Sequence, residues 1–418
     1  MSAILSLPAL RPMVSSLLRH RLMPLLVLGQ IVLACAILTN VAFLLQRQLG
    51  PMLVDDGIVR NEILLVDQLM LQNARWTTAQ SQALQRALQA IPGVRAVAPT
   101  MGLPMRQTMS FSMTLRSPAG VEITPTGFAG DGLVQALGLE LAQGRDFNAD
   151  DYVTGGGMFN RGAQGIVPVI VTQALADKFF PDGHALGGRL DGGDEKSQYV
   201  VVGIVRHLLR YELAELDDGH AEESLVYPMR DMTRMPRMAY SVRTEPAQRE
   251  AVKAAIPGVI QREFGPQLMR DIPVVVETYE KVRNFSFKQR RAAAWLLGSV
   301  CAVVTLITLI GIASLTGYWI EQRTRQIGIR RALGASRAQV LRHFQIENLL
   351  LTTLGLVLGL PLAYAVNQCL MQYYELPRLP LMYLPVGATL LWALGQCAVL
   401  GPARRAAAIA PAIATRSA

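Results

Sequence analysis

Four long stretches without a charged side chain constrain the fold of this chain more than any other feature. They cover residues 22–45, 292–320, 348–374 and 384–403. A helix of about 20 apolar residues is long enough to cross the hydrocarbon core of a bilayer. We therefore predict a membrane protein with four transmembrane α-helices, at residues 22–45, 292–320, 346–367 and 384–403.

The first stretch has a second interpretation, as the apolar core of a cleaved signal peptide. Such cores are normally about 7–15 residues long and end at a small-residue cleavage site. Residues 22–45 form a run of 24 residues, and no Ala-x-Ala pattern closes it. These features favour an uncleaved first span.

The distribution of basic residues indicates a topology. Within a formal net charge of +9, residues 1–22, 321–344 and 402–418 together hold twelve Arg and one acidic residue, Glu321. Residues 46–291 are close to neutral, with 27 basic and 28 acidic side chains. Loops rich in Arg stay in the cytoplasm, so the excess charge is explained without nucleic acid as a partner.

Successive loops of a membrane protein lie on alternate sides of the bilayer. Four spans therefore predict a multi-pass protein of the inner (cytoplasmic) membrane, with both termini on the same side. Lys288, Arg290 and Arg291 lie immediately outside the second span, where the positive-inside rule expects few basic residues. Long loops, however, translocate largely regardless of charge. The predicted segments are a cytoplasmic N-terminal segment (1–21), a large periplasmic domain (46–291), a cytoplasmic loop (321–345), a periplasmic turn (368–383) and a cytoplasmic tail (404–418).

The long polar segment has a β-α-β pattern at each of its ends. Strand, helix and strand signals occur in turn at 62–71, 81–90 and 94–98, and again at 238–243, 247–264 and 272–276. Two such units suit a ferredoxin-like α+β fold. We predict a ferredoxin-like porter subdomain (46–105 and 232–280), a glycine-rich, β-rich inserted subdomain (106–231) and a helical stalk (281–291) that extends the second span.

A basic, amphipathic segment separates the second and third spans. Residues 323–333 carry too many charges to enter hydrocarbon, so this segment must lie along the membrane surface. Gly334 ends it, and the spacing of Ser336 and Gln339 predicts a capping box at the start of the next helix.

The run RTRQIGIRRALGASRAQVLRHFQIENLLL resembles the cytoplasmic loop of MacB/FtsX-like ABC transporter permeases. LVQALGLELAQGRDFNADD, VIVTQALADKFFPDGHALGGRL and YVVVGIV are similar to the periplasmic core domain of MacB-like permeases. The resemblance implies that the cytoplasmic loop is a coupling helix that docks into an ATPase subunit, with Gln326 where the family usually has Glu. The predicted ATPase-coupling residues are Arg323, Arg325, Gln326, Ile327, Ile329, Arg330, Arg331, Leu333, Gly334 and Glu347.

Two of the features in this region have alternative interpretations. Glu347, at the cytoplasmic edge of a span, is either the ion-pair partner of an Arg in the coupling segment or a polar anchor without a coupling role. Gly355 and Gly359 form a small-xxx-small face, which serves either packing within one chain or a dimer interface.

Motifs for catalysis are absent from the sequence. No G-x-x-x-x-G-K-[ST] loop is present to hold nucleotide phosphates, so we expect this chain to bind no cofactor, with ATP and Mg on a separate ATPase subunit. No zinc-protease or hydrolase motif occurs, and His207 and His220 near Glu212, Glu215, Asp217 and Asp218 read as a solvated acidic loop rather than a metal site. The acidic pairs at 55–56 and 150–151 read as loop or cap residues.

The sequence thus predicts a non-catalytic permease subunit of a MacB-like, mechanotransmitting ABC transporter. The resemblance implies two copies of the ATPase subunit and a permease homodimer or heterodimer. A periplasmic adaptor and an outer-membrane channel are further candidate partners. An FtsX-like regulator of a cell-wall hydrolase, a lipoprotein-release permease and a membrane-anchored enzyme are the alternatives, and no motif names a substrate.

Overall fold

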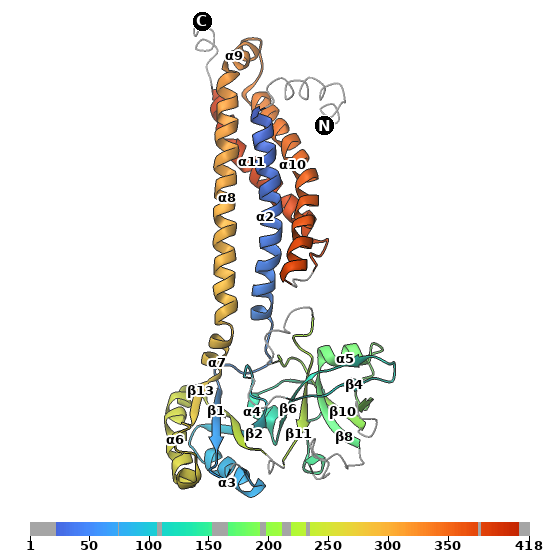
Figure 1. The fold of residues 1–418 in the computed structure, drawn as a ribbon, viewed down its shortest axis with the longest axis vertical. Helices are drawn as coiled ribbons and strands as arrows, with labels where there is room; N and C mark the ends of the chain where they lie inside the picture. The colour runs from blue at the N-terminus through green and yellow to red at the C-terminus, as the bar shows by residue number, and fades with distance from the viewer. Residues whose placement is uncertain are drawn as a thin grey trace. The chain divides into compact units, whose positions relative to one another are not determined.

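The computed structural model describes residues 22–73, 75–106, 111–152, 166–192, 198–210, 219–230, 235–374 and 378–408. The chain divides into two compact units (Figure 1). We call Gly50–Gln289 the sheet domain, and Met1–Leu49 together with Arg290–Ala418 the helical unit.

The helical unit contains long apolar helices. In the described part of the chain, four helices are long and apolar enough to cross a membrane. They are α2 (Leu22–Leu53), α8 (Lys288–Gln322), α10 (Arg337–Tyr374) and α11 (Tyr383–Ala408), and each contains one of the four stretches predicted to span the bilayer.

Small residues and side-chain amides bring these helices together. A Cβ atom at Gly355 would lie 2.5 Å from the side chain of Ile31, and one at Gly359 would lie 2.7 Å from Cβ of Cys35. The small-xxx-small face of α10 therefore packs on α2 of the same chain. The amide of Asn40 reinforces this contact by donating to the carbonyl of Ala363 at 3.0 Å, a bond suited to an apolar environment.

The two ends of the sheet domain meet in one antiparallel, four-stranded arrangement. The first β-α-β unit consists of β1 (Ile63–Met70), α3 (Thr78–Gln89) and β2 (Val94–Met101); the second consists of β12 (Arg237–Thr244), α6 (Arg249–Phe264) and β13 (Val275–Thr278). The strand order is β13-β1-β12-β2. We call these four strands with α3 and α6 the four-stranded part.

The chain between β2 and β12 forms the inserted part. Its strands continue the sheet in the order β6-β11-β8-β10-β9-β4-β5, with β3 beside β6 and β7 beside β10. The elements are β3 (Phe111–Ser112), β4 (Leu115–Arg116), β5 (Glu122–Ile123), β6 (Thr126–Gly130), α4 (Leu133–Leu137), β7 (Leu141–Gly144), β8 (Ile166–Thr172), α5 (Gln173–Phe179), β9 (Arg189–Gly192), β10 (Gln198–Val205) and β11 (Ser224–Pro228). Short 3-10 helices occupy Ala149–Tyr152, Pro246–Gln248 and Gly265–Gln267.

Apolar side chains form two clusters in the sheet domain. One contains Leu84 and Leu88 of α3 with Val252 and Ile256 of α6. The other includes Leu133 of α4, together with Tyr279 and Phe287. Alternation of side chains along β1 divides its residues between the clusters, since Leu64 and Val66 belong to the first and Ile63 and Leu65 to the second.

The segment predicted as a stalk consists of two helical pieces. Helix α7 (Tyr279–Ser286) is separate from α8, and Phe287 lies between them. The ring of Phe287 is 2% exposed and belongs to the sheet-domain core. Burial of this side chain anchors the end of α7 in the sheet domain.

Candidate functional site: the coupling segment and the Asp56 joint

The predicted coupling segment folds as a short helix between α8 and α10. Helix α9 spans Thr324–Ala332, with Arg323 at its N-cap and Leu333 at its C-cap. Gly334 follows with φ +98°, a conformation that glycine adopts without strain. The predicted capping box is confirmed, because Ser336 N donates to Gln339 Oε1 at 2.9 Å and Gln339 N donates to Ser336 Oγ at 3.2 Å.

One face of α9 packs into the helical unit. Ile327 is 6% exposed and shares an apolar cluster with Ile320, Val340 and Phe344. The amide of Ile327 donates to the carbonyl of Arg323 at 2.9 Å. Ile327 was predicted as a coupling residue; its position shows that it holds α9 against the helices rather than facing outward.

The opposite face is exposed and partly apolar. Arg325, Ile329 and Leu333 recur at intervals of four residues, so they lie along one side of the helix. Ile329 is 46% exposed and Leu333 is 84% exposed, while Arg325 and Gln326 are exposed beside them. We call these four residues the outward face of α9. Ile329 and Leu333 thus form an exposed apolar pair beside the cation of Arg325.

An ion pair connects the start of α9 to the third span helix. Arg323 Nη1 lies 3.3 Å from Glu347 Oε1, and the side chain of Glu347 is 3% exposed. The guanidinium also lies over the ring of Trp319, 4.5 Å from its centroid. The ion pair between Glu347 and an Arg of the coupling segment is therefore present in the structure, and its role in coupling stays a prediction.

The remaining predicted residues differ in position. Arg331 is half-buried, and Gly334 is exposed at the turn. The backbone of Arg330 lies within α9, but its side chain lies outside the described part of the structure.

A buried carboxylate in the sheet domain was missed by the sequence interpretation. The side chain of Asp56 is 0% exposed, although residues 55–56 read as a loop or cap pair. Its Oδ2 accepts hydrogen bonds from Tyr279 Oη and from Arg283 Nε, both at 2.9 Å, and from Arg60 Nε at 3.0 Å. Burial, followed by the charge of Asp56, raises the pKa of Tyr279 well above its usual range, which keeps the phenol protonated as a donor.

These bonds make Asp56 a joint between two distant segments. Arg283 of α7 also donates from Nη2 to the carbonyl of Met52, in the last turn of α2, at 2.9 Å. The chain that follows α2 and the helix that precedes α8 are thus held together at one carboxylate. We call Asp56, Arg60, Tyr279 and Arg283 the Asp56 joint. Local sequence carries little signal for it, because Tyr279 and Arg283 lie more than 220 positions away.

His207 and His220 each lie within hydrogen-bond distance of a carboxylate. His207 Nδ1 lies 2.6 Å from Glu222 Oε1, and His220 Nδ1 lies 2.8 Å from Glu223 Oε1. No group of three or more potential metal ligands occurs among the described residues. The acids at 212, 215, 217 and 218 lie outside them.

Comparison with known proteins identifies the family. Residues 38–259, more than half of the chain, match the MacB-like periplasmic core domain, and residues 298–411 match the FtsX-like permease C-terminal domain. The chain belongs to the MacB/FtsX-like permease family. This family membership accounts for the pairing of a large mixed sheet domain with apolar helices in one chain.

Relatives of this MacB/FtsX-like permease are ABC transporter components. It is 24% identical to the uncharacterized ABC transporter permease YknZ of Bacillus subtilis over 287 residues, which is 67% of this chain and 64% of the relative. It is 27% identical to the macrolide export ATP-binding/permease protein MacB of Chromobacterium violaceum over 240 residues, which is 55% of this chain and 33% of the relative. The chain thus spans between about a third and two thirds of the length of these relatives.

Two solved structures are also similar to this permease. The extracellular domain of YknZ covers 51% of this chain and 99% of its own, with 15% identity and a TM-score of 0.33. The periplasmic region of MacB from Actinobacillus actinomycetemcomitans covers 56% of this chain and 97% of its own, with 12% identity and a TM-score of 0.36.

Proposed function

We propose that this chain is the permease subunit of a MacB-like, mechanotransmitting ABC transporter of the inner membrane. The carrying observation is the outward face of α9, where Ile329 and Leu333 are exposed on a helix whose other side is held by Ile327 and by the pair of Arg323 with Glu347. An ABC ATPase subunit would bury these two side chains and place acidic groups near Arg325. ATP and Mg belong to that partner.

The pair of Arg323 with Glu347 would carry movement of α9 into the third span. A charge-assisted bond between two poorly exposed groups holds a defined geometry, whereas exposed pairs at a surface contribute little. Two copies of the ATPase acting on two permease chains, identical or related, would move both coupling segments in one cycle.

The Asp56 joint would receive that movement on the periplasmic side. Because α7 and the chain after α2 are bonded to one carboxylate, the sheet domain would respond to both helical connections together. In this proposal the four-stranded part is a ferredoxin-like porter subdomain, and the inserted part is a separate subdomain. Changes in the conformation of the sheet domain would drive substrate export.

Co-purification tests the assignment. The full-length chain is co-expressed with ABC-type ATPases from its own genome and purified through an affinity tag on the permease. We expect one ATPase to co-purify, and Leu333→Asp or Ile329→Asp to reduce its recovery at least tenfold. Leu186→Asp, at an exposed leucine of the sheet domain, is the matched control and should leave recovery unchanged. Retention of the ATPase by both α9 variants would refute the docking site.

A further inference from the structure

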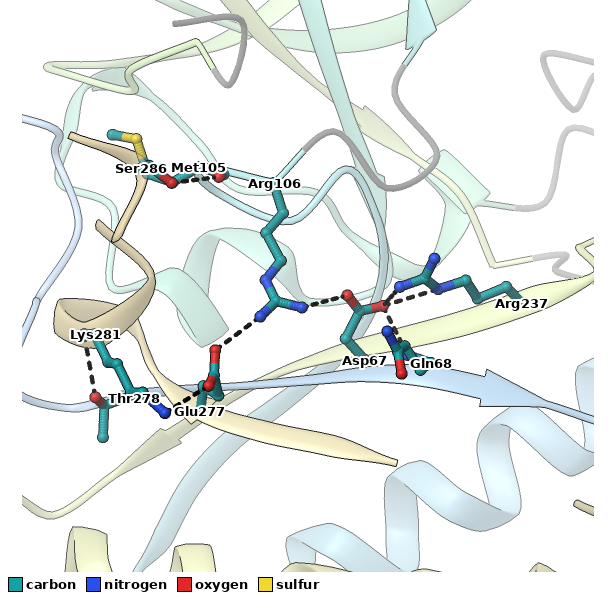
Figure 2. Close-up of polar contacts among 9 residues, drawn as sticks. All are labelled: Asp67, Gln68, Met105, Arg106, Arg237, Glu277, Thr278, Lys281 and Ser286. Carbon is teal, nitrogen blue, oxygen red and sulfur yellow. Dashed lines mark hydrogen bonds and ion pairs between the residues drawn. The ribbon is translucent and has the colours of Figure 1, made fainter. Parts of the chain in front are cut away.

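A second buried carboxylate, Asp67, lies at the centre of an ion-pair network in the sheet domain (Figure 2). Its side chain is 1% exposed. It accepts from Arg106 Nη1 at 2.9 Å and from Arg237 through Nε at 3.0 Å and Nη2 at 2.7 Å. The backbone amide of Gln68 donates to it at 2.7 Å. Gln68 has φ +65°, where the register of β1 against β12 shifts, so this bond stabilises a bulge that glutamine adopts at a conformational cost.

The two arginines occupy special places in the chain. Arg106 lies between β2, which ends at Met101, and β3 of the inserted part, and Arg237 is the first residue of β12. The chain therefore leaves the four-stranded part near Arg106 and returns to it at Arg237. Both crossings are bonded to the same carboxylate of β1.

Other contacts between the two parts include backbone pairing, apolar packing and a bond from Arg243 Nη1 to the carbonyl of Gln135 at 3.5 Å. The sheet is continuous from β2 to β6 through only two residue pairs, Thr100 with Gly130 and Met101 with Ala129. Apolar side chains of α4 in the second core cluster add buried area to the contact between the two parts. Hydrophobic contacts are non-directional, whereas the forked bonds of a guanidinium fix the position of a carboxylate. The bond from Arg106 to Asp67 thus adds a buried, directional side-chain contact to the backbone pairing of the two parts.

The same network is connected to α7. Arg106 Nη2 lies 2.7 Å from Glu277 Oε2, and Lys281 of α7 lies 2.8 Å from Glu277 Oε1. Ser286 Oγ, at the end of α7, donates to the carbonyl of Met105 at 3.0 Å. Figure 2 shows these contacts. A displacement of α7 would therefore be passed to residues 105–106, where the chain leaves the four-stranded part.

We propose that Asp67 is a positioning residue that fixes the orientation of the inserted part against the four-stranded part. Its bond to Arg106 transmits displacement of α7 to the outgoing crossing, and its bonds to Arg237 hold the returning one. The inference concerns the sheet domain and stands whether or not α9 binds an ATPase.

Pulsed electron-electron resonance on the full-length chain in lipid nanodiscs tests this role. The four native cysteines are replaced by alanine, and spin labels are attached to cysteines at Ala254 on α6 and Asp177 on α5, both exposed. We expect one narrow distance distribution for the parent chain. Asp67→Asn should broaden it at least twofold, and Arg106→Gln or Arg237→Gln should each broaden it less, because one crossing remains bonded.

Glu122→Gln is the matched control, since it removes a carboxylate from an exposed pair with Arg116 in the same domain; it should keep the parent width. A folded Asp67→Asn chain with the parent width would overturn the proposal, because a purely structural role lowers the melting temperature without changing orientation below it. If Asp67→Asn does not fold, the two arginine variants decide in the same way. Failure of all three to fold would also overturn it, since Asp67 would then maintain the fold itself.

Discussion

The guanidinium of Arg323 lies 3.3 Å from the carboxylate of Glu347, although 24 positions separate the two residues. The pair joins the N-cap of α9 to α10, and neither side chain is more than 16% exposed. A helix rich in arginine is thereby fixed to an apolar helix, and its outward face is left exposed.

Loss of the pair of Arg323 with Glu347 should weaken the attachment of α9 to α10. Glu347→Gln leaves the guanidinium of Arg323 without its charged partner, and breaking a buried pair typically costs about 3–5 kcal/mol. We expect trypsin to cleave the purified protein at Arg325 and Arg331 at least tenfold faster. Glu321→Gln, at an exposed acid in the same region, should not change the rate. Equal cleavage of parent and Glu347→Gln would show that the pair does not hold α9.

Asp56 and its neighbour Asp55 should differ sharply in their effect on stability. Asp56→Asn weakens the bonds to Tyr279, Arg283 and Arg60, so we expect the free energy of unfolding to fall by about 3 kcal/mol. Asp55 is exposed, and Asp55→Asn should change it by less than about 1 kcal/mol. Urea denaturation of the full-length protein measures both, followed by the fluorescence of Trp76 after Trp295, Trp319 and Trp392 are replaced by Phe. Equal effects would contradict the burial of Asp56.

Glycines on α10 and α8 should respond oppositely to enlargement. A side chain at Gly359 would meet Cβ of Cys35 at 2.7 Å, whereas one at Gly317 meets nothing within 4 Å. Gly359→Val should therefore lower the melting temperature in detergent by several degrees, because α2 and α10 must separate. Gly317→Ala should leave it unchanged or raise it, since alanine favours helix by about 1 kcal/mol over glycine. A tolerated Gly359→Val would argue against this packing.

The contribution of Glu277 to the stability of the fold should depend on pH. The bond from Lys281, and then the charges of Lys281 and Arg106, hold the pKa of Glu277 below its ordinary value of 4.5. A depressed folded-state pKa stabilises the fold above the ordinary value, and this contribution is lost as the pH falls through the folded-state pKa. Glu277→Gln should therefore lower the urea midpoint at pH 7 by a small amount, because the pair is solvent-screened. The difference in urea midpoint between the parent chain and Glu277→Gln should narrow below pH 4. A constant difference from pH 7 to pH 3 would contradict the depressed pKa of Glu277.

The sequence predicted elements where one physical signal dominated. Charge-free runs located the four long helices, and the capping box of Ser336 and Gln339 located the start of α10 at Arg337, ahead of the span predicted from residue 346. Local β-α-β patterns located β1, α3, β2, β12, α6 and β13 within a few residues. These signals depend on neighbours in the chain.

Buried ion pairs could not be located in this way. Asp56 and Asp67 have partners up to 227 and 170 positions away, and the pairing of strands across the inserted part brings them together. In α9, helical periodicity distinguishes the two isoleucines. Residues two positions apart lie on different sides of a helix, which separates Ile327 from Ile329.

The most direct test of the account is a photo-crosslink from the outward face of α9. A photoreactive amino acid replaces Leu333 in the full-length chain, and adducts formed in native membranes are identified by mass spectrometry. Replacement of Ile327, which is buried, serves as the control. We predict that position 333 forms an adduct with an ABC-type ATPase and that position 327 forms none. Absence of an ABC ATPase from the adducts at 333, or equal yield from both positions, would contradict the proposal that α9 docks the motor subunit.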